Sequence, residues 1–379
     1  MATTVRAATN WARSGTARIV AALVVAGAAA AGCSGGGDAE VTSDSVPATT
    51  GTAPSTTAPT TTAPATTLPV VERERSPLNG LPLPPGMDTS RPAVAVKIDN
   101  HVDARPQAGL EAADLVFEEQ VESLSRFAAV FWSVDTEVGP VRSARTGDID
   151  LLSGLGSPVL GWSGGNSGTR AAVASSALVD RGAERFEALY WRVDDRFAPH
   201  DLFTDTASLI ESAREAATPP EPMLPFATDE AAGRAAAARG RPAAGAAVDF
   251  QGVDVAWVWD DGARAWLRFQ DGAPHLVVSG RQLRAANVVI LGTTYMASSA
   301  DPLSPEAQSV GEGGAIVLGP AGRAVEGTWF RAGPFAAYEL FDAEGEPISL
   351  EAGVTWVELP PAGSTTLLDA AAAELLVGS

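Results

Sequence analysis

The sequence predicts a mixed α/β (α+β) protein, in which an N-terminal domain of a sheet and helices precedes a mostly antiparallel β domain. Apolar, strand-like runs alternate with helical segments over residues 76–225, which indicates a sheet covered by helices. Residues 246–362 carry Asp-Gly turn signals between alternating apolar runs, which is typical of β-hairpins. Residues 226–245, between these two regions, are rich in alanine and proline and predict a linker.

Residues 1–32 have the pattern of an export signal. Three arginines and no acidic residue precede the apolar run 19–31, which is too short to span a bilayer as a helix. Small residues then precede Cys33, the single cysteine of the chain. This pattern predicts a bacterial lipoprotein signal with Cys33 as the acylated first residue of the mature chain, held on the membrane by its acyl chains. The alternative is an ordinary signal peptide followed by a free thiol.

Residues 33–75 predict a disordered tether. The stretch is rich in threonine, proline and alanine and has no aromatic residue, so it cannot bury enough apolar surface to offset its chain entropy. A coil of about 40 residues spans roughly 35 Å. We therefore expect the folded body to stand away from the outer face of the cytoplasmic membrane, to which only the acyl anchor attaches it.

The charge of the chain excludes two classes of partner. The net charge is −20, and removal of residues 1–32 with their three arginines takes it to −23. A strongly acidic protein lacks the basic patches that bind nucleic acid phosphates. The same charge opposes electrostatic binding to anionic lipid.

The first domain, residues 76–225, contains strands and helices in alternation. Strand-like apolar runs cover residues 93–98, 114–122, 126–134 and 157–162. Helices are predicted at residues 146–155, 167–179 and 205–217. The last of these begins behind Asp205, a residue type that favours the N-cap position.

The second domain, residues 246–362, is predicted to be rich in hairpins. An Ala/Arg stretch in the linker before it predicts a short helix from Asp229 to a stop at Gly240. Asp-Gly pairs at 261–262 and 271–272 then predict two tight turns. We expect residues 363–379 to form a C-terminal tail, as a short helix or a frayed end.

Five segments of the chain share a recognisable family pattern. They are "RPAVAVKIDNHVDARPQAGLEAADLVFEEQVESLSRFAAVFWS", "VGPVRSAR", "FAPHDLFT", "WDDGARAWLRFQDGAPH" and "EGTWFRAGPFAAYELFDAEGEPISLEAGVTWVELP". Together they resemble the YerB-like lipoprotein family. The resemblance covers nearly all of residues 76–362. It implies an N-terminal and a C-terminal domain, both of unknown function, in a tethered extracytoplasmic lipoprotein. It implies no particular activity.

Polar side chains gather directly after the strand at 93–98, where open α/β sheets tend to place ligands. The predicted ligand-binding residues are Asp99, Asn100, His101, Arg105, Glu118, Arg142, Arg145 and His200. Arginines hold carboxylates and phosphates by charge-assisted hydrogen bonds. This set therefore predicts a pocket for an anionic molecule of the cell envelope.

Each of these residues also has a purely structural interpretation. Asn100 and Asp103 could cap a turn, and Arg105 could pair with Asp103. Both later arginines of the set could pair with Asp148 or with other acids of this acidic chain. A histidine that follows a strand is more often a buried hydrogen-bond donor than a ligand.

A metal site is the weaker hypothesis. Asp99, His101, His200 and Asp201 have suitable residue types, but no spacing such as H-x-x-x-H supports a metal. We therefore predict no metal and no cofactor. The third histidine, His275, lies beside a predicted turn and is expected to be exposed.

The run GWSGG, residues 161–165, fits the G-x-S-x-G pattern of a nucleophile elbow. Chance matches are frequent in a chain with 38 glycines. We favour a glycine turn before a helix over a nucleophilic Ser163, and we predict no catalytic residue.

The function that these observations favour is that of a non-enzymatic binding or scaffold lipoprotein of the cell envelope. Its partner would be a cell-wall polymer or a wall-assembly protein. The alternative is a hydrolase or transferase that acts on a cell-wall glycopolymer or ester, with His101, His200 or Ser163 in the chemistry. A third reading is a structural protein without a small ligand. A ligand site requires that His101, Arg142 and His200 converge on one surface.

Overall fold

The computed structural model describes residues 74–378. The predicted signal segment, Cys33 and all but the last two residues of the predicted tether lie outside the described residues. The described residues belong to one compact unit. No helix among residues 74–378 combines the length and the apolar character needed to cross a membrane.

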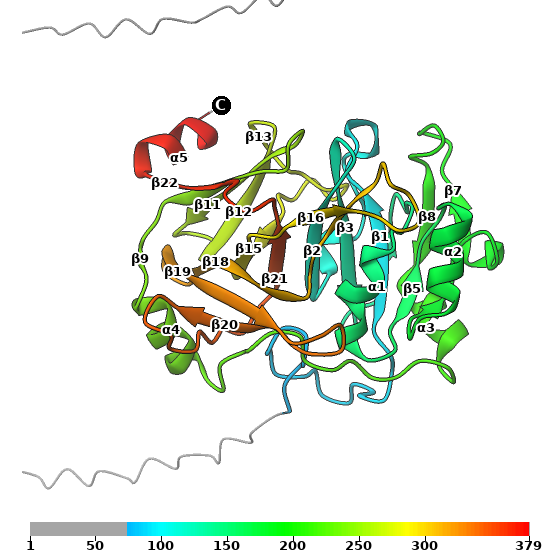
Figure 1. Ribbon diagram of the computed structural model, residues 1–379, viewed down its shortest axis with the longest axis horizontal. Coiled ribbons are helices and arrows are strands. Elements are labelled where there is room, and N and C mark those ends of the chain that lie inside the picture. Colours follow the sequence, from blue (N-terminus) through cyan, green and yellow to red (C-terminus); the bar gives the residue numbers. More distant parts are fainter. Residues whose placement is uncertain (1–73, 379) are drawn as a thin grey trace, which may run out of the picture. The chain divides into compact units, whose positions relative to one another are not determined.

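A mixed sheet of 11 strands runs through the described part of the chain (Figure 1). Its strands from the first half are β1 (Val94–Asp99), β2 (Leu115–Val121), β3 (Leu124–Phe131), β5 (Val159–Gly161) and β6 (Val179–Asp180). Its strands from the second half are β9 (Arg241–Pro242), β15 (Asn287–Leu291), β18 (Gly311–Gly319), β19 (Arg323–Arg331), β20 (Glu339–Asp342) and β21 (Thr355–Leu359). The order is β20-β19-β18-β15-β21-β2-β3-β1-β5-β6, with β9 paired to β19.

The two halves of the chain share this sheet. β21 lies between β15 and β2 and pairs in parallel with both strands. The predicted mixture of sheets and helices is confirmed in the coarse sense that mixed sheets dominate and helices are few. The continuity of the sheet across both halves is not part of the prediction, because a register between strands far apart in sequence leaves no local pattern.

A second sheet, of six strands in the described residues, is entirely antiparallel. Its strands are β10 (Gly245–Asp249), β11 (Asp254–Asp260), β12 (Ala265–Gln270), β13 (Ala273–Pro274), β14 (Arg284–Ala285) and β22 (Thr365–Leu368). Asp271 and Gly272, between β12 and β13, both have positive φ, 53° and 79°, as a type I′ hairpin turn requires. β22 lies in the segment expected to be a tail, and helix α5 (Ala370–Val377) follows it.

Two small sheets and short helices complete the described fold. The small sheets contain β16 (Tyr295–Ala297) with β17 (Pro305–Ala307), and β4 (Glu137–Val138) and β7 (Tyr190–Arg192) on either side of β8 (Leu202–Asp205). The other α-helices are α1 (Gly147–Leu152), α2 (Ser167–Ala174), α3 (Thr206–Ala213) and α4 (Glu230–Ala238). The 3-10 turns are η1 (Val102–Ala104), η2 (Leu110–Ala112), η3 (Ser153–Leu155) and η4 (Glu187–Leu189). The predicted caps are present, because Asp205 and Asp229 accept hydrogen bonds from backbone N–H groups of α3 and α4.

The large sheet is buried on both faces. On β1, Val94, Val96 and Ile98 pack into one core, which also contains α3 and the inner face of the six-stranded sheet. Ala95 packs into a second core, which contains residues of α1 and η3. Successive side chains of a strand point to opposite faces, so this alternation assigns each later residue of β1 to one face or the other.

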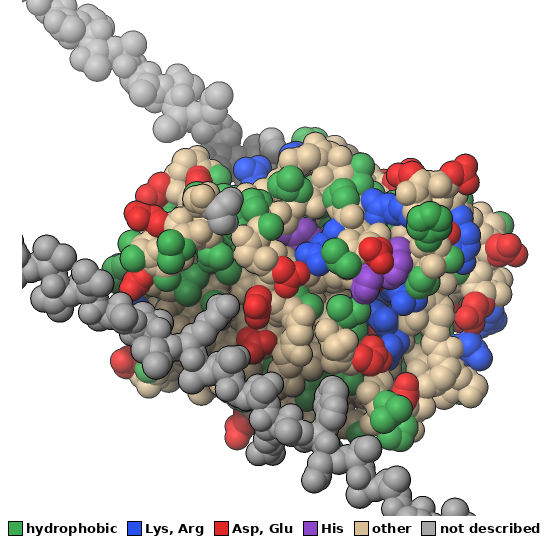
Figure 2. Space-filling view, turned by 90° about the horizontal axis from the view of Figure 1, so that it is seen from above, with side chains coloured by type: hydrophobic (Ala, Val, Ile, Leu, Met, Phe, Trp, Pro, Cys, Tyr) green, Lys and Arg blue, Asp and Glu red, His purple; other side chains and the backbone are tan. Residues whose placement is uncertain are grey.

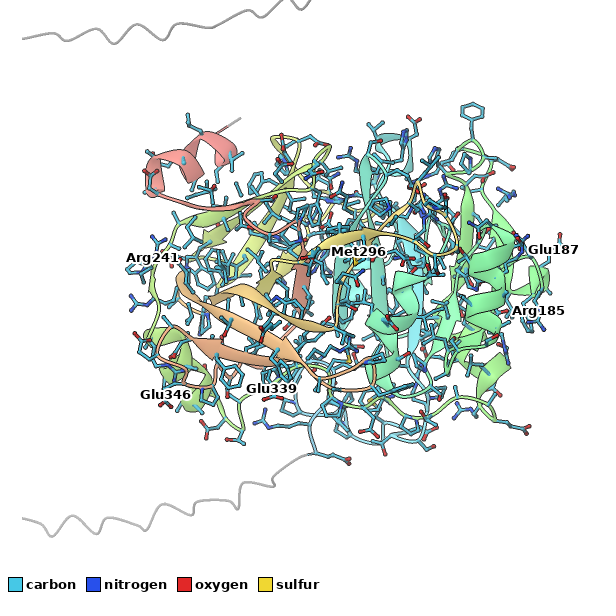
Figure 3. All side chains as sticks on the ribbon, viewed as in Figure 1. Arg185, Glu187, Arg241, Met296, Glu339 and Glu346 are labelled. Carbon is cyan, nitrogen blue, oxygen red and sulfur yellow. The ribbon has the colours of Figure 1, made fainter. Side chains whose placement is uncertain are left out.

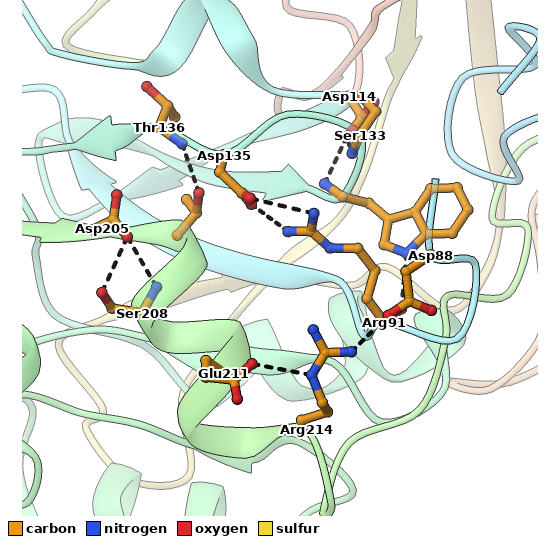
Figure 4. A network of polar contacts seen from close by, with 12 residues as sticks. Asp88, Arg91, Asp114, Ser133, Asp135, Thr136, Asp205, Ser208, Glu211 and Arg214 are labelled. Atoms are coloured by element: carbon orange, nitrogen blue, oxygen red, sulfur yellow. Dashed lines mark hydrogen bonds and ion pairs between the residues drawn. The ribbon is translucent and has the colours of Figure 1, made fainter. Parts of the chain in front are cut away.

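Ion pairs connect surface segments in the first half of the chain (Figure 4). Arg91 pairs with Asp135, and Arg214 donates to Asp88 over 2.7 Å. Pairs of this exposed kind stabilise a fold by about 0–1 kcal/mol each. Asp114 differs because it is buried and accepts hydrogen bonds from two backbone N–H groups. It therefore holds the chain that leaves β3.

Candidate functional site

Asp99, the last residue of β1, is the centre of a polar cluster. Its side chain is 1% exposed. Oδ2 accepts a hydrogen bond from His200 Nδ1 over 2.7 Å and lies 3.0 Å from Arg142 Nε. Oδ1 accepts from the backbone N–H of His101 over 3.1 Å. Burying a carboxylate is costly without such partners, so Asp99 fixes both side chains at the end of the strand.

The rings of His101 and His200 stack on each other. Their centroids are 4.6 Å apart and their planes differ by 14°. The His200 side chain is 14% exposed and that of His101 is 34% exposed. Arg196 holds the His200 loop against η1 by donating to the carbonyl oxygens of Ala104 and Pro106. Because Nδ1 of His200 donates to Asp99, its Nε2 is the nitrogen available to a ligand.

Arg126 brings a buried positive charge to the same face of the sheet. It lies directly opposite Asp99 in the register of β1 and β3, and it is only 5% exposed. Its Nη1 donates to the carbonyl oxygen of Ser143 over 3.2 Å, whereas its Nε has no hydrogen-bond partner. Burial and the positive charges of Arg145 and Arg142 lower the pKa of Arg126 to about 10. None of the ion pairs found among residues 74–378 includes Arg126.

Arg142 and Arg145 lie on a segment that crosses the end of β1. The N–H of Arg142 donates to the carbonyl oxygen of Lys97. Arg145 pairs with Glu122 over 2.7 Å and donates from Nε to Ser304 Oγ over 2.7 Å. Ser304 belongs to the connection between β16 and β17, so that hairpin also holds the site. Figure 2 shows histidine side chains beside Lys and Arg side chains on this face.

The arginines of the cluster are not equally paired. Asp99 and Glu122 are the acids paired with Arg142 and Arg145. Arg126 forms no direct ion pair within the described residues and donates to a carbonyl oxygen, although the charges of Asp99 and Glu122 attract it. An oxyanion with several acceptor oxygens would supply hydrogen-bond acceptors to these guanidinium groups.

Two of the predicted site residues lie on the opposite face of the sheet. Asn100 Nδ2 donates to Ser125 Oγ over 2.7 Å. Glu118 accepts from Arg268 Nη2 at both of its oxygens, over 2.9 and 2.7 Å. The period of a strand explains this separation, because Asn100 follows Asp99 and so points the other way. Asn100 and Glu118 therefore belong to a buried network and not to the cluster around Asp99.

Arg105 also lies apart from the cluster. It pairs with Asp271, in the turn between β12 and β13, over 3.1 Å. The expected partner, Asp103, instead lies 3.4 Å from His101 Nδ1. Arg105 thus joins the loop after β1 to the second half of the chain.

The expectation that His275 is exposed is wrong. His275 is 3% exposed, and its Nε2 lies 2.8 Å from Gln107 Oε1. Burial and the adjacent charge of Arg268 hold the pKa of His275 well below its usual range. The turn at Asp271 and Gly272 returns the chain along β12, so that the N–H of His275 donates to the carbonyl oxygen of Arg268.

Ser163 lies in a glycine turn that precedes α2. Gly164 and Gly165 have φ of 89° and 134°, conformations that side chains other than glycine rarely adopt. Asn166 then caps α2 by accepting from the N–H of Thr169 over 2.8 Å. Within the described part of the chain, no hydrogen bond joins Ser163 to a histidine.

A buried ion triad adjoins the cluster and is absent from the sequence predictions. Lys97, the only lysine, donates to Glu119 over 2.8 Å and to Asp148 over 2.6 Å. Burial raises the pKa of Glu119 to about 7, and the negative charge of Asp148 adds to this rise. The positive charge of Lys97 lowers the pKa but does not cancel the rise. Asp148 also accepts from the backbone N–H of Arg145 over 2.7 Å, so the triad positions Arg145. The only signal for this triad in the sequence was a single lysine inside an apolar strand.

Comparisons with known proteins agree with this fold. Residues 78–219 match "Protein of unknown function (DUF3048) N-terminal domain", and residues 246–357 match the corresponding C-terminal domain. A protein of Bacillus subtilis (strain 168) named "Putative lipoprotein YerB" is 37% identical over 145 residues, which are 37% of this chain and 43% of that protein. The match thus spans less than half of that relative. The crystal structure of YerB protein from Bacillus subtilis resembles 78% of this chain and 100% of its own, with a TM-score of 0.67 and 23% identity, a likeness that concerns the fold.

Proposed function

The chain belongs to the DUF3048 family, and from this premise we propose that it is a membrane-anchored lipoprotein that binds an oxyanion of the cell envelope. The family description names no activity, so the proposal for binding rests on the cluster around Asp99. The proposal for anchoring rests on the pattern before Cys33 and on the word lipoprotein in the name of the Bacillus subtilis relative.

The observation that carries the binding proposal is Arg126. A guanidinium that is 5% exposed and forms no direct ion pair with a described residue is costly to bury, even with the charges of Asp99 and Glu122 nearby. Arg142 Nε and His200 Nδ1 both face the same carboxylate, Asp99. A phosphate or carboxylate group bound here would accept hydrogen bonds from the guanidinium groups of Arg126 and Arg142.

The source of the oxyanion is a cell-wall polymer or a wall-assembly protein. A tether of the length and composition of residues 33–75 would let the body reach roughly 35 Å from its anchor. Anionic wall polymers present repeated phosphates or carboxylates in this zone. The function is recognition, with the anchor keeping the site at the membrane surface.

One observation favours a second function, that of a hydrolase or transferase. The hydrogen bond from His200 to Asp99 is the arrangement that orients a histidine as a general base. Ser163 makes no hydrogen bond to that histidine within the described residues, so the base would act on water. Turnover of a wall ester or glycopolymer that disappears in His200→Ala would favour this function over recognition.

The binding proposal is tested by titrating the full chain, in detergent, with inorganic phosphate and with acetate by isothermal calorimetry. Arg126→Gln should weaken binding of the preferred anion about tenfold or more, since a hydrogen bond to a charged group contributes about 1.5–3 kcal/mol. Arg241→Gln is the matched control, because Arg241 forms an exposed pair with Glu326. Arg241 (labelled in Figure 3) belongs to β9, which lies far from β1 in Figure 1. Equal affinities for the wild type and both variants would contradict the proposal.

The anchoring proposal is tested by Cys33→Ala. Removal of the acylated thiol should move the protein from the membrane fraction to the soluble extracytoplasmic fraction, because no acyl chain then holds it. Fractionation and immunoblotting measure this change, and globomycin treatment should block the processing of the wild type. Unchanged membrane retention of Cys33→Ala would contradict an anchor at Cys33.

A further inference from the structure

We propose that His101, Asp103 and His200 form a binding site for one divalent transition-metal ion of the Zn²⁺ type. Each of the three residues offers one ligand atom, and these atoms all lie within 4.8 Å of one another. The three residues come from the turn after β1 and from the loop before β8, so only the folded chain brings them together. The inference goes beyond the proposed function, which uses the arginines and requires no metal.

The chemistry of the donors suits zinc. Histidine nitrogens and carboxylate oxygens are usual Zn²⁺ ligands, and three protein ligands leave a fourth position open in a tetrahedral site. No sulfur atom takes part, which disfavours soft ions such as Cu(I). The carboxylate of Asp103 supplies the negative charge of the set.

The geometry requires an adjustment, because His101 Nδ1 accepts a hydrogen bond from the backbone N–H of Asp103 over 3.2 Å, and the ion would replace this bond. With metal–ligand bonds of about 2.1 Å, two ligands of a tetrahedral ion lie roughly 3.4 Å apart. His101 Nδ1 and Asp103 Oδ2 are already 3.4 Å apart. The His101 ring stacks on His200 at 4.6 Å and is partly exposed, so a rotation of this ring can bring its nitrogen to the ion.

Asp99 provides the support that metal-binding histidines usually have. A histidine ligand almost always donates its second ring N–H to a carboxylate or carbonyl, which fixes the tautomer and the ring orientation. His200 donates from Nδ1 to the buried Asp99 over 2.7 Å. Its Nε2 is then the nitrogen that can bind the ion. This hydrogen bond is independent of the spacing of the three ligands and points to the same use.

The neighbouring positive charges predict how the site behaves. Arg142 lies 3.0 Å from Asp99, and a nearby guanidinium opposes the arrival of a second cation. An oxyanion on the fourth position would offset this repulsion and would bind the ion and the arginines together. The joint binding of an oxyanion by the ion and the arginines rests on the proposed function, whereas binding of the metal alone does not.

The test is a titration of the metal-free full chain, in detergent, with Zn²⁺ in competition with a chromophoric chelator and with no phosphate present. We expect one Zn²⁺ per chain, with affinity reduced at least tenfold in His200→Ala and in His101→Ala. Asp99→Asn should weaken binding about 10- to 100-fold through its effect on His200. Co²⁺ should give the visible absorption of a tetrahedral site in the wild type and lose it in His200→Ala.

Two controls separate this inference from the binding of anions. Arg126→Gln should keep its Zn²⁺ affinity while it loses anion affinity. Asp150→Asn, at an exposed carboxylate of α1, should bind Zn²⁺ as the wild type does. His101 is partly exposed, so His101→Ala should fold, and circular dichroism checks this. The absence of stoichiometric Zn²⁺ binding, or equal binding in the wild type and His200→Ala, would overturn the inference.

Discussion

At the scale of single residues, the end of β1 distributes charged side chains between two faces of one sheet. Asp99 and Lys97 point to the face that carries the arginine cluster and the ion triad. Asn100 points to the other face, where Glu118 and Arg268 form a fully buried pair. The alternation of a strand thus directs Asp99 to the anion-binding candidate and its neighbour Asn100 to the buried ion pair on the other face.

The ion triad predicts a dependence of stability on pH. The pKa of Glu119 is raised from 4.5 to about 7 in the folded state, so the folded chain binds this proton more tightly than the unfolded chain does. The free energy of unfolding should therefore decrease as the pH rises from about 4.5 through 7. Glu119→Gln should remove the part of this decrease in the free energy of unfolding that comes from Glu119. Urea denaturation at pH 5 and at pH 8 measures the decrease in both proteins. A variant whose loss of stability between those pH values equals that of the wild type would contradict this assignment.

At the scale of elements, local patterns predict the individual strands and helices well. The apolar runs at 93–98, 114–122 and 126–134 correspond to β1, β2 and β3, because β-branched and aromatic residues mark each run. The Asp-Gly turn at 271–272 and the caps of α3 and α4 were also predictable, since each depends on neighbouring residues alone. The hairpin predicted at 261–262 is present, but it closes through residues 261–264, where Arg264 and not Gly262 has positive φ. The pairing of β2 with β21 was not predictable, because it joins segments separated by most of the folded chain.

The candidate site was predictable from the sequence only in part. The sequence analysis grouped Asp99 and His101, which follow a strand-like run, with His200, which has suitable chemistry, and the structure brings them into contact. It missed Arg126, whose only signal was an arginine at the start of an apolar run. It wrongly grouped Glu118 with them, because residue type alone does not tell which face a side chain takes. The role of the cluster in binding stays a prediction.

The pair between β2 and β12 predicts a large effect on stability. Arg268 and Glu118 are both fully buried, and Arg268 also lies 5.3 Å from the ring centroids of Phe127 and Trp356. Removal of one partner leaves an uncompensated charge, so Arg268→Met should lower the free energy of unfolding by about 3–5 kcal/mol. Adding Glu118→Gln should recover part of this loss. Urea denaturation measures both, and a double variant less stable than Arg268→Met would contradict this explanation.

At the scale of the whole molecule, the shared sheet makes the two sequence halves depend on each other. β21 pairs in parallel with β2 on one side and with β15 on the other. The pair of Arg268 with Glu118 adds a buried link between the six-stranded sheet and the large one. Neither half can keep these contacts alone, although the family description divides the chain into two domains.

This continuity predicts a single unfolding transition for the body. Tryptophan fluorescence, which reports mainly on the second half through Trp257, Trp266, Trp329 and Trp356, should coincide with far-ultraviolet circular dichroism across a urea titration. A fragment of residues 76–225 should lack a cooperative transition because β2 would lose its partner β21. Two separate transitions in the intact chain, or a cooperatively folded fragment, would contradict this prediction.

The central claim is that the arginine and histidine cluster at the end of β1 binds an oxyanion. Its most direct test is a crystal of the folded body soaked in selenate, a tetrahedral oxyanion that anomalous scattering locates without ambiguity. The account predicts an anomalous peak within hydrogen-bond distance of Arg126 and Arg142 that disappears in Arg126→Gln and persists in Arg241→Gln. A crystal in which selenate occupies other positions and leaves this cluster empty would contradict the account.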